Sequence, residues 1–140
     1  MAYLDTNVFL YASSALKESD EKSRQARLVL EKVARQMFPA STSAITWDEV
    51  VWASKRVVPY NEALQKGNDV LAFPGLAICD FTLAVARKAA ELAEKYMLKP
   101  HDAIHAATAI LNGEREIITD DADFDRVKEL RRVSLAEAVR

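Results

Sequence analysis

Tyr3-Leu4-Asp5-Thr6-Asn7 is the stretch that decides the predicted fold of this chain. Tyr3 and Leu4 favour a short buried strand. Asp5 follows them directly, and a carboxylate in an apolar layer is costly unless charged partners or hydrogen bonds offset its desolvation. Asn7 is a good N-cap for the apolar residues that follow, so a helix is expected to begin there. Ligand groups lie at the carboxyl ends of strands in an open α/β sheet, so Asp5 is the first candidate site residue.

Strands and helices alternate along the rest of the chain. We expect strands at 40–43, 76–81, 116–119 and 133–135, and helices at 20–37, 46–53, 61–73, 83–96 and 101–111. The run 76–81 is apolar apart from Asp80, as a strand covered on both faces would be. This alternation predicts an α/β fold, with a central, mainly parallel sheet between two layers of helices.

Length, composition and charge limit the class of protein. A chain of 140 residues, 50% hydrophobic and 29% charged, predicts a single domain over 1–140. The net charge of −2 excludes a protein coated in basic surface, although a metal and a local basic patch can still dominate a nucleic-acid site. The one cysteine, Cys79, cannot form an internal disulfide, and neither a signal peptide nor a membrane span of roughly 20 apolar residues is recognisable. We therefore expect a cytoplasmic protein without a membrane partner.

Acidic side chains occur at several predicted element ends. Asp5 ends the first strand, Asp102 begins an alanine-rich helix, and Asp121 and Asp123 follow the strand 116–119. In a parallel α/β sheet these ends share one edge, so the acids can converge from distant parts of the sequence. Crowded acids repel one another unless a cation lies among them. Clustered carboxylates suit Mg²⁺ or Mn²⁺, and no cysteine or histidine spacing indicates zinc.

A purely structural explanation also exists for the last three of these acids and for a further acid, Glu49. Glu49 lies three residues after Thr46, the spacing of a capping box in which Glu49 bonds back to the Thr46 amide. Asp102 lies in a first helical turn, where the helix dipole favours an acid. Asp121 or Asp123 could cap the short turn that follows them. From the residues alone, both explanations stay open.

Four segments together resemble a known family. They are Asp5-Thr6-Asn7-Val8, Glu49 before an apolar helix, Asp102-Ala103-Ile104-His105-Ala106-Ala107-Thr108-Ala109, and Ile118-Thr119-Asp120-Asp121-Ala122-Asp123-Phe124. They occur in the order of a PIN domain, and the chain resembles a VapC-type toxin ribonuclease over nearly its full length. This resemblance implies a compact α/β/α sandwich and metal-dependent cleavage of RNA. Because such proteins are often dimeric and paired with a small antitoxin, it also implies a homodimer and an antitoxin partner.

The resemblance also implies roles for individual residues. The catalytic acids it implies are Asp5, Glu49, Asp102 and Asp121. The metal ligands it implies are Asp5, Asp102, Asp121 and Asp123, whereas Asp120 matches a variable position. The supporting polar residues are Thr6, Asn7 and Thr119. With this match, a place in the metal site is favoured over the capping box for Glu49.

The resulting hypothesis is a Mg²⁺- or Mn²⁺-dependent RNA endonuclease that hydrolyses phosphodiester bonds, acting as the toxin of a toxin–antitoxin pair. Because its acids repel phosphate, basic residues at the rim must hold the RNA. Lys55 and Arg56, at the end of the Glu49 helix, are the first candidates for RNA binding. Further candidates are Arg24, Arg27, Lys128, Arg131 and Arg132.

Two other classes of protein compete with this hypothesis. One is a PIN-shaped module with weak or no catalysis that acts by binding protein or RNA, in which Trp52 or Tyr60 would mark a partner surface. The other is a phosphatase of the haloacid dehalogenase type, but that family has a second Asp where this chain has Asn7. His105, one turn after Asp102, is interpreted as a packed or hydrogen-bonded side chain.

Overall fold

The computed structural model describes residues 2–13 and 20–140, and within them the strands form one parallel sheet. The five strands lie in the order β3-β2-β1-β4-β5. Their bounds are β1 (Ala2–Leu4), β2 (Ala40–Ser43), β3 (Leu76–Cys79), β4 (Glu116–Ile118) and β5 (Arg131–Val133). Tyr3 of β1 pairs with Ser41 of β2 on one side and with Ile117 of β4 on the other. The N-terminal strand is therefore the centre of the sheet.

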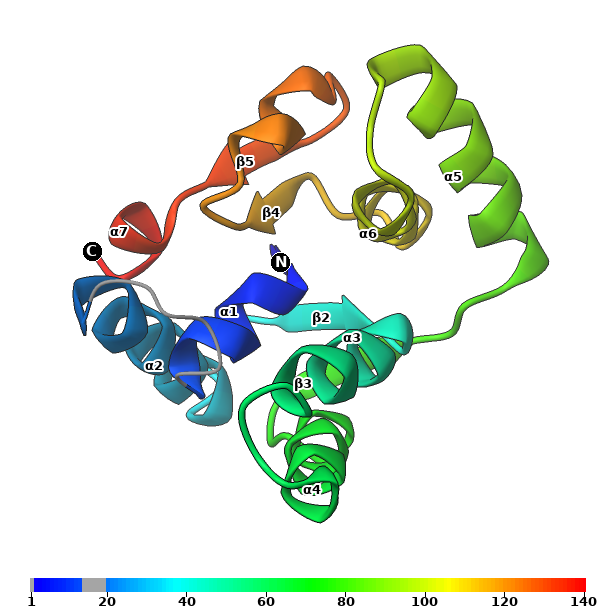
Figure 1. Ribbon diagram of the computed structural model, residues 1–140. Helices are drawn as coiled ribbons and strands as arrows, with labels where there is room; N and C mark the ends of the chain where they lie inside the picture. Colours follow the sequence, from blue (N-terminus) through cyan, green and yellow to red (C-terminus); the bar gives the residue numbers. More distant parts are fainter. Residues whose placement is uncertain (1, 14–19) are drawn as a thin grey trace.

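Helices cover both faces of this sheet (Figure 1). One face carries α1 (Thr6–Ala12), α2 (Asp20–Ala34), α3 (Ile45–Ser54), α4 (Tyr60–Leu71) and α7 (Leu135–Ala138). The other face carries α5 (Leu83–Tyr96), α6 (Pro100–Leu111) and the short 3₁₀ helix η1 (Ala122–Arg126). The predicted three-layer α/β/α sandwich is confirmed.

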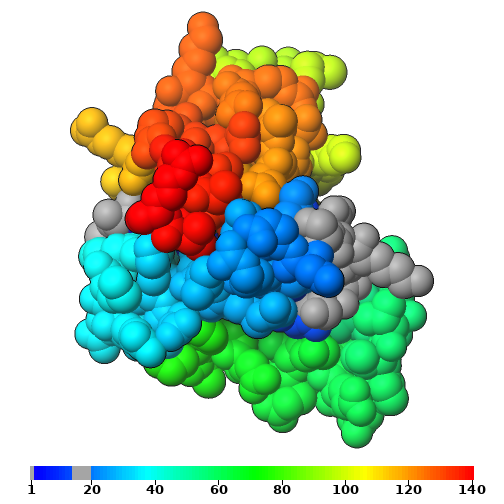
Figure 2. Space-filling view, turned by 90° about the vertical axis from the view of Figure 1, so that its left-hand side faces the viewer, coloured from blue at the N-terminus to red at the C-terminus, as the bar shows by residue number. Residues whose placement is uncertain are grey.

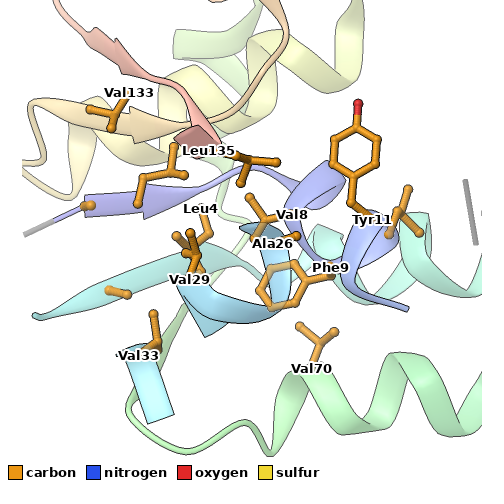
Figure 3. Packing of buried hydrophobic residues seen from close by; sticks show 14 of the residues in the cluster. Leu4, Val8, Phe9, Tyr11, Ala26, Val29, Val33, Val70, Val133 and Leu135 are labelled. Atoms are coloured by element: carbon orange, nitrogen blue, oxygen red, sulfur yellow. The ribbon is translucent and has the colours of Figure 1, made fainter. Parts of the chain in front are cut away.

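Alternate residues of β1 supply the two hydrophobic cores. Leu4 packs with Val8, Val29 and Leu135 on the α1 and α2 side, where Figure 3 shows these side chains converging. Tyr3 points to the opposite face and belongs to the core formed with α5 and α6. A strand buried on both faces fixes the register of its neighbours, because a slip by one residue would exchange the two sets of side chains.

The end of α2 differs from the prediction. The helix was expected to reach residue 37, but it ends at Ala34 in a Schellman motif. The Gln36 amide bonds to the Val33 carbonyl and the Met37 amide to the Lys32 carbonyl, while Gln36 adopts a left-handed φ of 57°. Gly75 lies against this turn, where a Cβ would come within 2.3 Å of the Val33 oxygen. Ser19 precedes this helix and is a residue type that favours an N-cap, but it lies outside the described residues.

The prediction that residues 76–81 form a strand covered on both faces is wrong. β3 spans only Leu76–Cys79, lies at one edge of the sheet, and is partly exposed along its length. A run of apolar residues reports local preference for a strand but not the position of that strand in the sheet. The free thiol of Cys79 is half-buried there.

The C-terminal helix closes the fold against α2. In Figure 2 the C-terminal residues, in red, lie directly on the blue surface of α2. The Lys32 ammonium donates to the carbonyl of Ala138 at 3.3 Å, which ties the two helices together. Among the described residues, no helix is both long and apolar enough to cross a membrane.

Candidate functional site

The acids predicted from the sequence lie beyond the carboxyl ends of the three central strands. Asp5 follows β1, Asp121 follows β4, and Glu49 lies in the first half of α3, which begins directly after β2. Asp102 lies in the first turn of α6. The sheet order β2-β1-β4 brings these ends together, so acids up to 116 residues apart in sequence share one edge.

Asp5 is held rigidly at the centre of this edge. Its side chain caps α1, accepting from the Thr6 amide at 2.8 Å through Oδ1. Oδ2 accepts from the hydroxyl of Thr119 at 2.8 Å. The expected cap Asn7 is instead the second residue of the helix. Asp5 as a whole residue is only 4% exposed, and burial raises the pKa of its carboxyl group despite the opposing charge of His105 and the Thr119 hydrogen bond.

Glu49 does not form the capping box that its sequence position allows. α3 begins one residue before Thr46, with Ala44 as a cap that makes no side-chain hydrogen bond. Oε1 of Glu49 instead lies 2.5 Å from Nε2 of His105 and accepts from the Thr6 hydroxyl at 3.0 Å. Burial alone would raise the pKa of Glu49, but the hydrogen bond and charge of His105 lower it below its ordinary value.

His105 joins three segments at the base of the site. Its ring is fully buried, with Nδ1 2.6 Å from the Tyr3 hydroxyl and Nε2 near both Glu49 and the Thr6 hydroxyl. Burial alone would lower the pKa of His105, but the Glu49 hydrogen bond and the charges of Asp5 and Asp102 outweigh it and raise the pKa. The interpretation of His105 as a hydrogen-bonded core side chain is confirmed. The sequence did not reveal that its partner is Glu49.

Asp102, Asp121 and Asp123 form the cluster most suited to a metal ion. One carboxylate oxygen from each lies within 4.8 Å of the others, and all three side chains are half-buried. Asp121 also caps η1 by accepting from the Asp123 amide at 2.9 Å, so its structural role and its place in the cluster coexist. A donor set made only of carboxylate oxygens fits the hard cations Mg²⁺ and Mn²⁺.

Thr119 links this cluster to Asp5. Its hydroxyl donates to Asp5 and accepts from the Asp121 amide at 3.0 Å. The four aspartates are thus close enough to interact: burial, and then the charges of Asp5 and Asp121, raise the pKa of Asp102 to about 6. Asp120 points elsewhere and accepts from the Leu135 amide at 2.9 Å, which agrees with its exclusion from the core acids.

Arg126 is a residue at the site that the sequence did not single out. Its guanidinium pairs with Asp123 at 3.0 Å and donates to the Met97 carbonyl, between α5 and α6, at 3.0 Å. It therefore fixes Asp123 against the loop that precedes Asp102. A basic residue three positions after an acid in a short helix is an ordinary surface pattern, so the sequence held no signal for this contact.

The candidate RNA-binding residues differ in how their charges are used. Arg24, Arg131 and Arg132 are paired with acids on the protein surface. Lys55 and Arg56 instead lie beside the indole of Trp52, just beyond the C-terminal end of α3.

The sequence matches the PIN domain model over residues 2–130. The chain therefore belongs to the PIN domain family. No curated protein matches it with significant similarity.

Solved structures agree with this assignment. A toxin–antitoxin complex from Klebsiella pneumoniae contains a chain that is 26% identical, with a TM-score of 0.67 and coverage of 94% of this chain and 96% of that chain. VapBC2 from Rickettsia felis, bound to a DNA fragment from its promoter, matches at 22% identity and TM-score 0.66, covering 96% and 98%. FitAcB from Neisseria gonorrhoeae matches at 20% identity and TM-score 0.63, covering 94% and 96%. The last two show the shared fold alone.

Proposed function

We propose that this protein is a Mg²⁺- or Mn²⁺-dependent RNA endonuclease. The observation that supports this most strongly is the convergence of Asp102, Asp121 and Asp123 from two distant segments, with Asp5 and Glu49 beside them. Such crowding of like charges is unfavourable without a cation. Membership of the PIN domain family supports a role for that cation in RNA cleavage.

In this proposal each acid has a distinct task. Asp102, Asp121 and Asp123 hold the ion, with Asp5 completing the cluster directly or through water. Asp5 is already oriented by Thr119 and the Thr6 amide, so little order has to be gained when substrate arrives. Glu49 uses Oε1 for both of its contacts with Thr6 and His105, so Oε2 stays available to accept a proton or bind water. A bound Mg²⁺ or Mn²⁺ supplies activation of water and neutralisation of phosphate charge.

The proposal is tested by incubating a mixed RNA pool with purified protein in Mg²⁺, in Mn²⁺ and in EDTA. We expect cutting by the wild type only with metal, and loss of cutting in Asp5→Asn. Asparagine keeps the helix cap while removing the charge, so this variant should fold. The matched control is Asp125→Asn, because Asp125 is an exposed acid of η1 that pairs with Arg132 and is not one of the clustered carboxylates. Equal cutting by wild type and Asp5→Asn, or cutting that persists in EDTA, would overturn the proposal.

We further propose that the protein is the toxin of a toxin–antitoxin pair, and that it binds a small antitoxin. The 26% identical chain from a toxin–antitoxin complex supports this pairing. A homodimer is proposed on the family resemblance alone. Co-expression with any small protein encoded next to its gene, followed by light scattering of the purified material, tests both. A monomer that copurifies with no such protein would contradict both.

A further inference from the structure

A hollow connects the carboxylate site to an exposed tryptophan. It has a volume of about 460 Å³ and is lined by Leu10, Asp48, Glu49, Trp52, Ala53 and His101. Glu49 thus belongs both to the hydrogen-bonded base of the site and to the wall of this hollow. The volume lies within the range of about 300–1,000 Å³ that is usual for small-ligand pockets, so one nucleotide can be accommodated.

Trp52 is an exposed aromatic residue that lines the hollow. The residue is 56% exposed, although it lies on the same helix as Glu49, one turn away. The Lys55 ammonium lies 3.7 Å from the ring centroid, and the Arg56 guanidinium carbon lies 5.8 Å from it. Among the described residues, neither cation forms an ion pair with an acid. The indole and two positive charges therefore form a single exposed surface.

We propose that Trp52, Lys55 and Arg56 form a platform for single-stranded RNA, with one unpaired base stacked on the indole and the adjoining phosphates bound by the two cations. This inference rests on the proposed ribonuclease function and assigns the residues that would bind its RNA outside the carboxylate cluster. Aromatic rings interleaved with basic side chains are the usual means of binding unpaired bases without reading their sequence. A duplex keeps its bases stacked on one another, so it offers none to the indole.

Two observations favour RNA over a protein partner on this surface. The positive charge complements a polyphosphate backbone, whereas the acids next to it would repel that backbone without such an anchor. The hollow also leads directly to Glu49, so a strand bound at Trp52 continues into the carboxylate site.

The test measures binding of two 12-nucleotide probes by fluorescence anisotropy, in Mg²⁺ and in the uncleaving Asp5→Asn background. One probe is oligouridylate, and the other is an abasic oligomer with the same number of phosphates but no bases. Trp52→Ala should weaken oligouridylate binding roughly five- to 150-fold and leave the abasic probe unaffected, while Trp52→Phe should retain most of the affinity. The matched control is Tyr60→Ala, an exposed aromatic residue that does not line the hollow.

The cations have a separate signature. Lys55→Gln and Arg56→Gln should each lower the affinity for both probes. Each should also reduce the slope of log affinity against log salt concentration by about 0.7 per lost phosphate contact. Equal affinity of Trp52→Ala and its parent for oligouridylate would overturn the platform. If wild type cleaves RNA but Trp52→Ala changes neither RNA affinity nor KM, the ribonuclease proposal is supported and the Trp52 platform is contradicted. If base-dependent binding requires Trp52 but wild type cuts no RNA, the platform is supported and the ribonuclease proposal is contradicted.

Discussion

At the scale of single residues, the site depends on hydrogen bonds that hold charged groups in place before any ligand arrives. Thr6 and His105 both contact Glu49, and Thr119 joins Asp5 to the backbone of Asp121. The sequence predicted which acids would gather, because the family motif contains them. It could not predict these links, since Glu49 also matched a capping box and only the tertiary structure shows which partner it takes.

Tyr3→Phe tests the support beneath Glu49. The substitution removes the hydroxyl that lies 2.6 Å from Nδ1 of the fully buried His105. Leaving a buried polar group without a partner costs about 1–3 kcal/mol, so we expect that loss in the free energy of unfolding measured with urea. Tyr60→Phe, at an exposed tyrosine, should change stability by no more than about 0.5 kcal/mol. Equal stability of the two variants would show that His105 does not depend on Tyr3.

Asp102→Asn tests the crowding of the acids. The pKa of Asp102 in the folded protein, about 6, lies above its ordinary value of 3.8, so the ionised form destabilises the fold above that pH. We expect the variant to be more stable than wild type in EDTA at pH 7.5, by about 1–2 kcal/mol after allowance for solvent screening. The gain should shrink as the pH falls through 6 towards 4, because wild type then takes up the proton. Urea unfolding of both proteins between pH 4 and pH 7.5 measures this difference in stability. A variant that is less stable than wild type at pH 7.5 would contradict the expected repulsion.

At the scale of elements, local sequence signals predicted where helices begin better than where helices end. They also predicted poorly where a strand lies in the sheet. The starts expected at residues 83 and 101 lie within one residue of those of α5 and α6, where the Thr82 side chain accepts from the Val85 amide and Pro100 occupies the first helical position. The Schellman turn at Gln36 carries no glycine, so the end of α2 had no clear sequence signal. β3 lies at an edge because of strand order, which depends on how the whole chain is connected rather than on its own residues.

Gly67→Ala tests how closely α3 and α4 pack. A Cβ at this position would lie 2.5 Å from Cγ2 of Val51 and 3.0 Å from Cδ1 of Trp47. Alanine favours a helix over glycine by up to about 1 kcal/mol, but overpacking costs about 1–3 kcal/mol and Val51 is stiff and buried. We expect a net loss of stability, seen as a lower melting temperature. Gln65→Ala, on the exposed side of the same helix, should leave it nearly unchanged. A more stable Gly67→Ala would mean that the helices can move apart at little cost.

At the scale of the whole molecule, sheet order converts distant sequence positions into one site. β1 lies at the centre, so the residue that follows it meets groups beyond β2 on one side and β4 on the other. The alternation of elements predicted this parallel sheet, and the acids at element ends predicted the edge at which carboxylates converge. Neither Arg126 nor the hollow leading to Trp52 could be predicted, because both arise from segments packed together only in three dimensions.

The central claim is that acids from distant segments form one divalent-cation site, and Mn²⁺ binding followed by electron paramagnetic resonance tests it most directly. Wild type should bind Mn²⁺ at pH 7.5 and progressively less as the pH falls through about 6, where Asp102 takes up a proton. Asp102→Asn and Asp121→Asn should each weaken binding at least about tenfold, while Asp125→Asn should bind as wild type does. Affinity that is the same in all four proteins and at every pH would contradict a metal site built from these carboxylates.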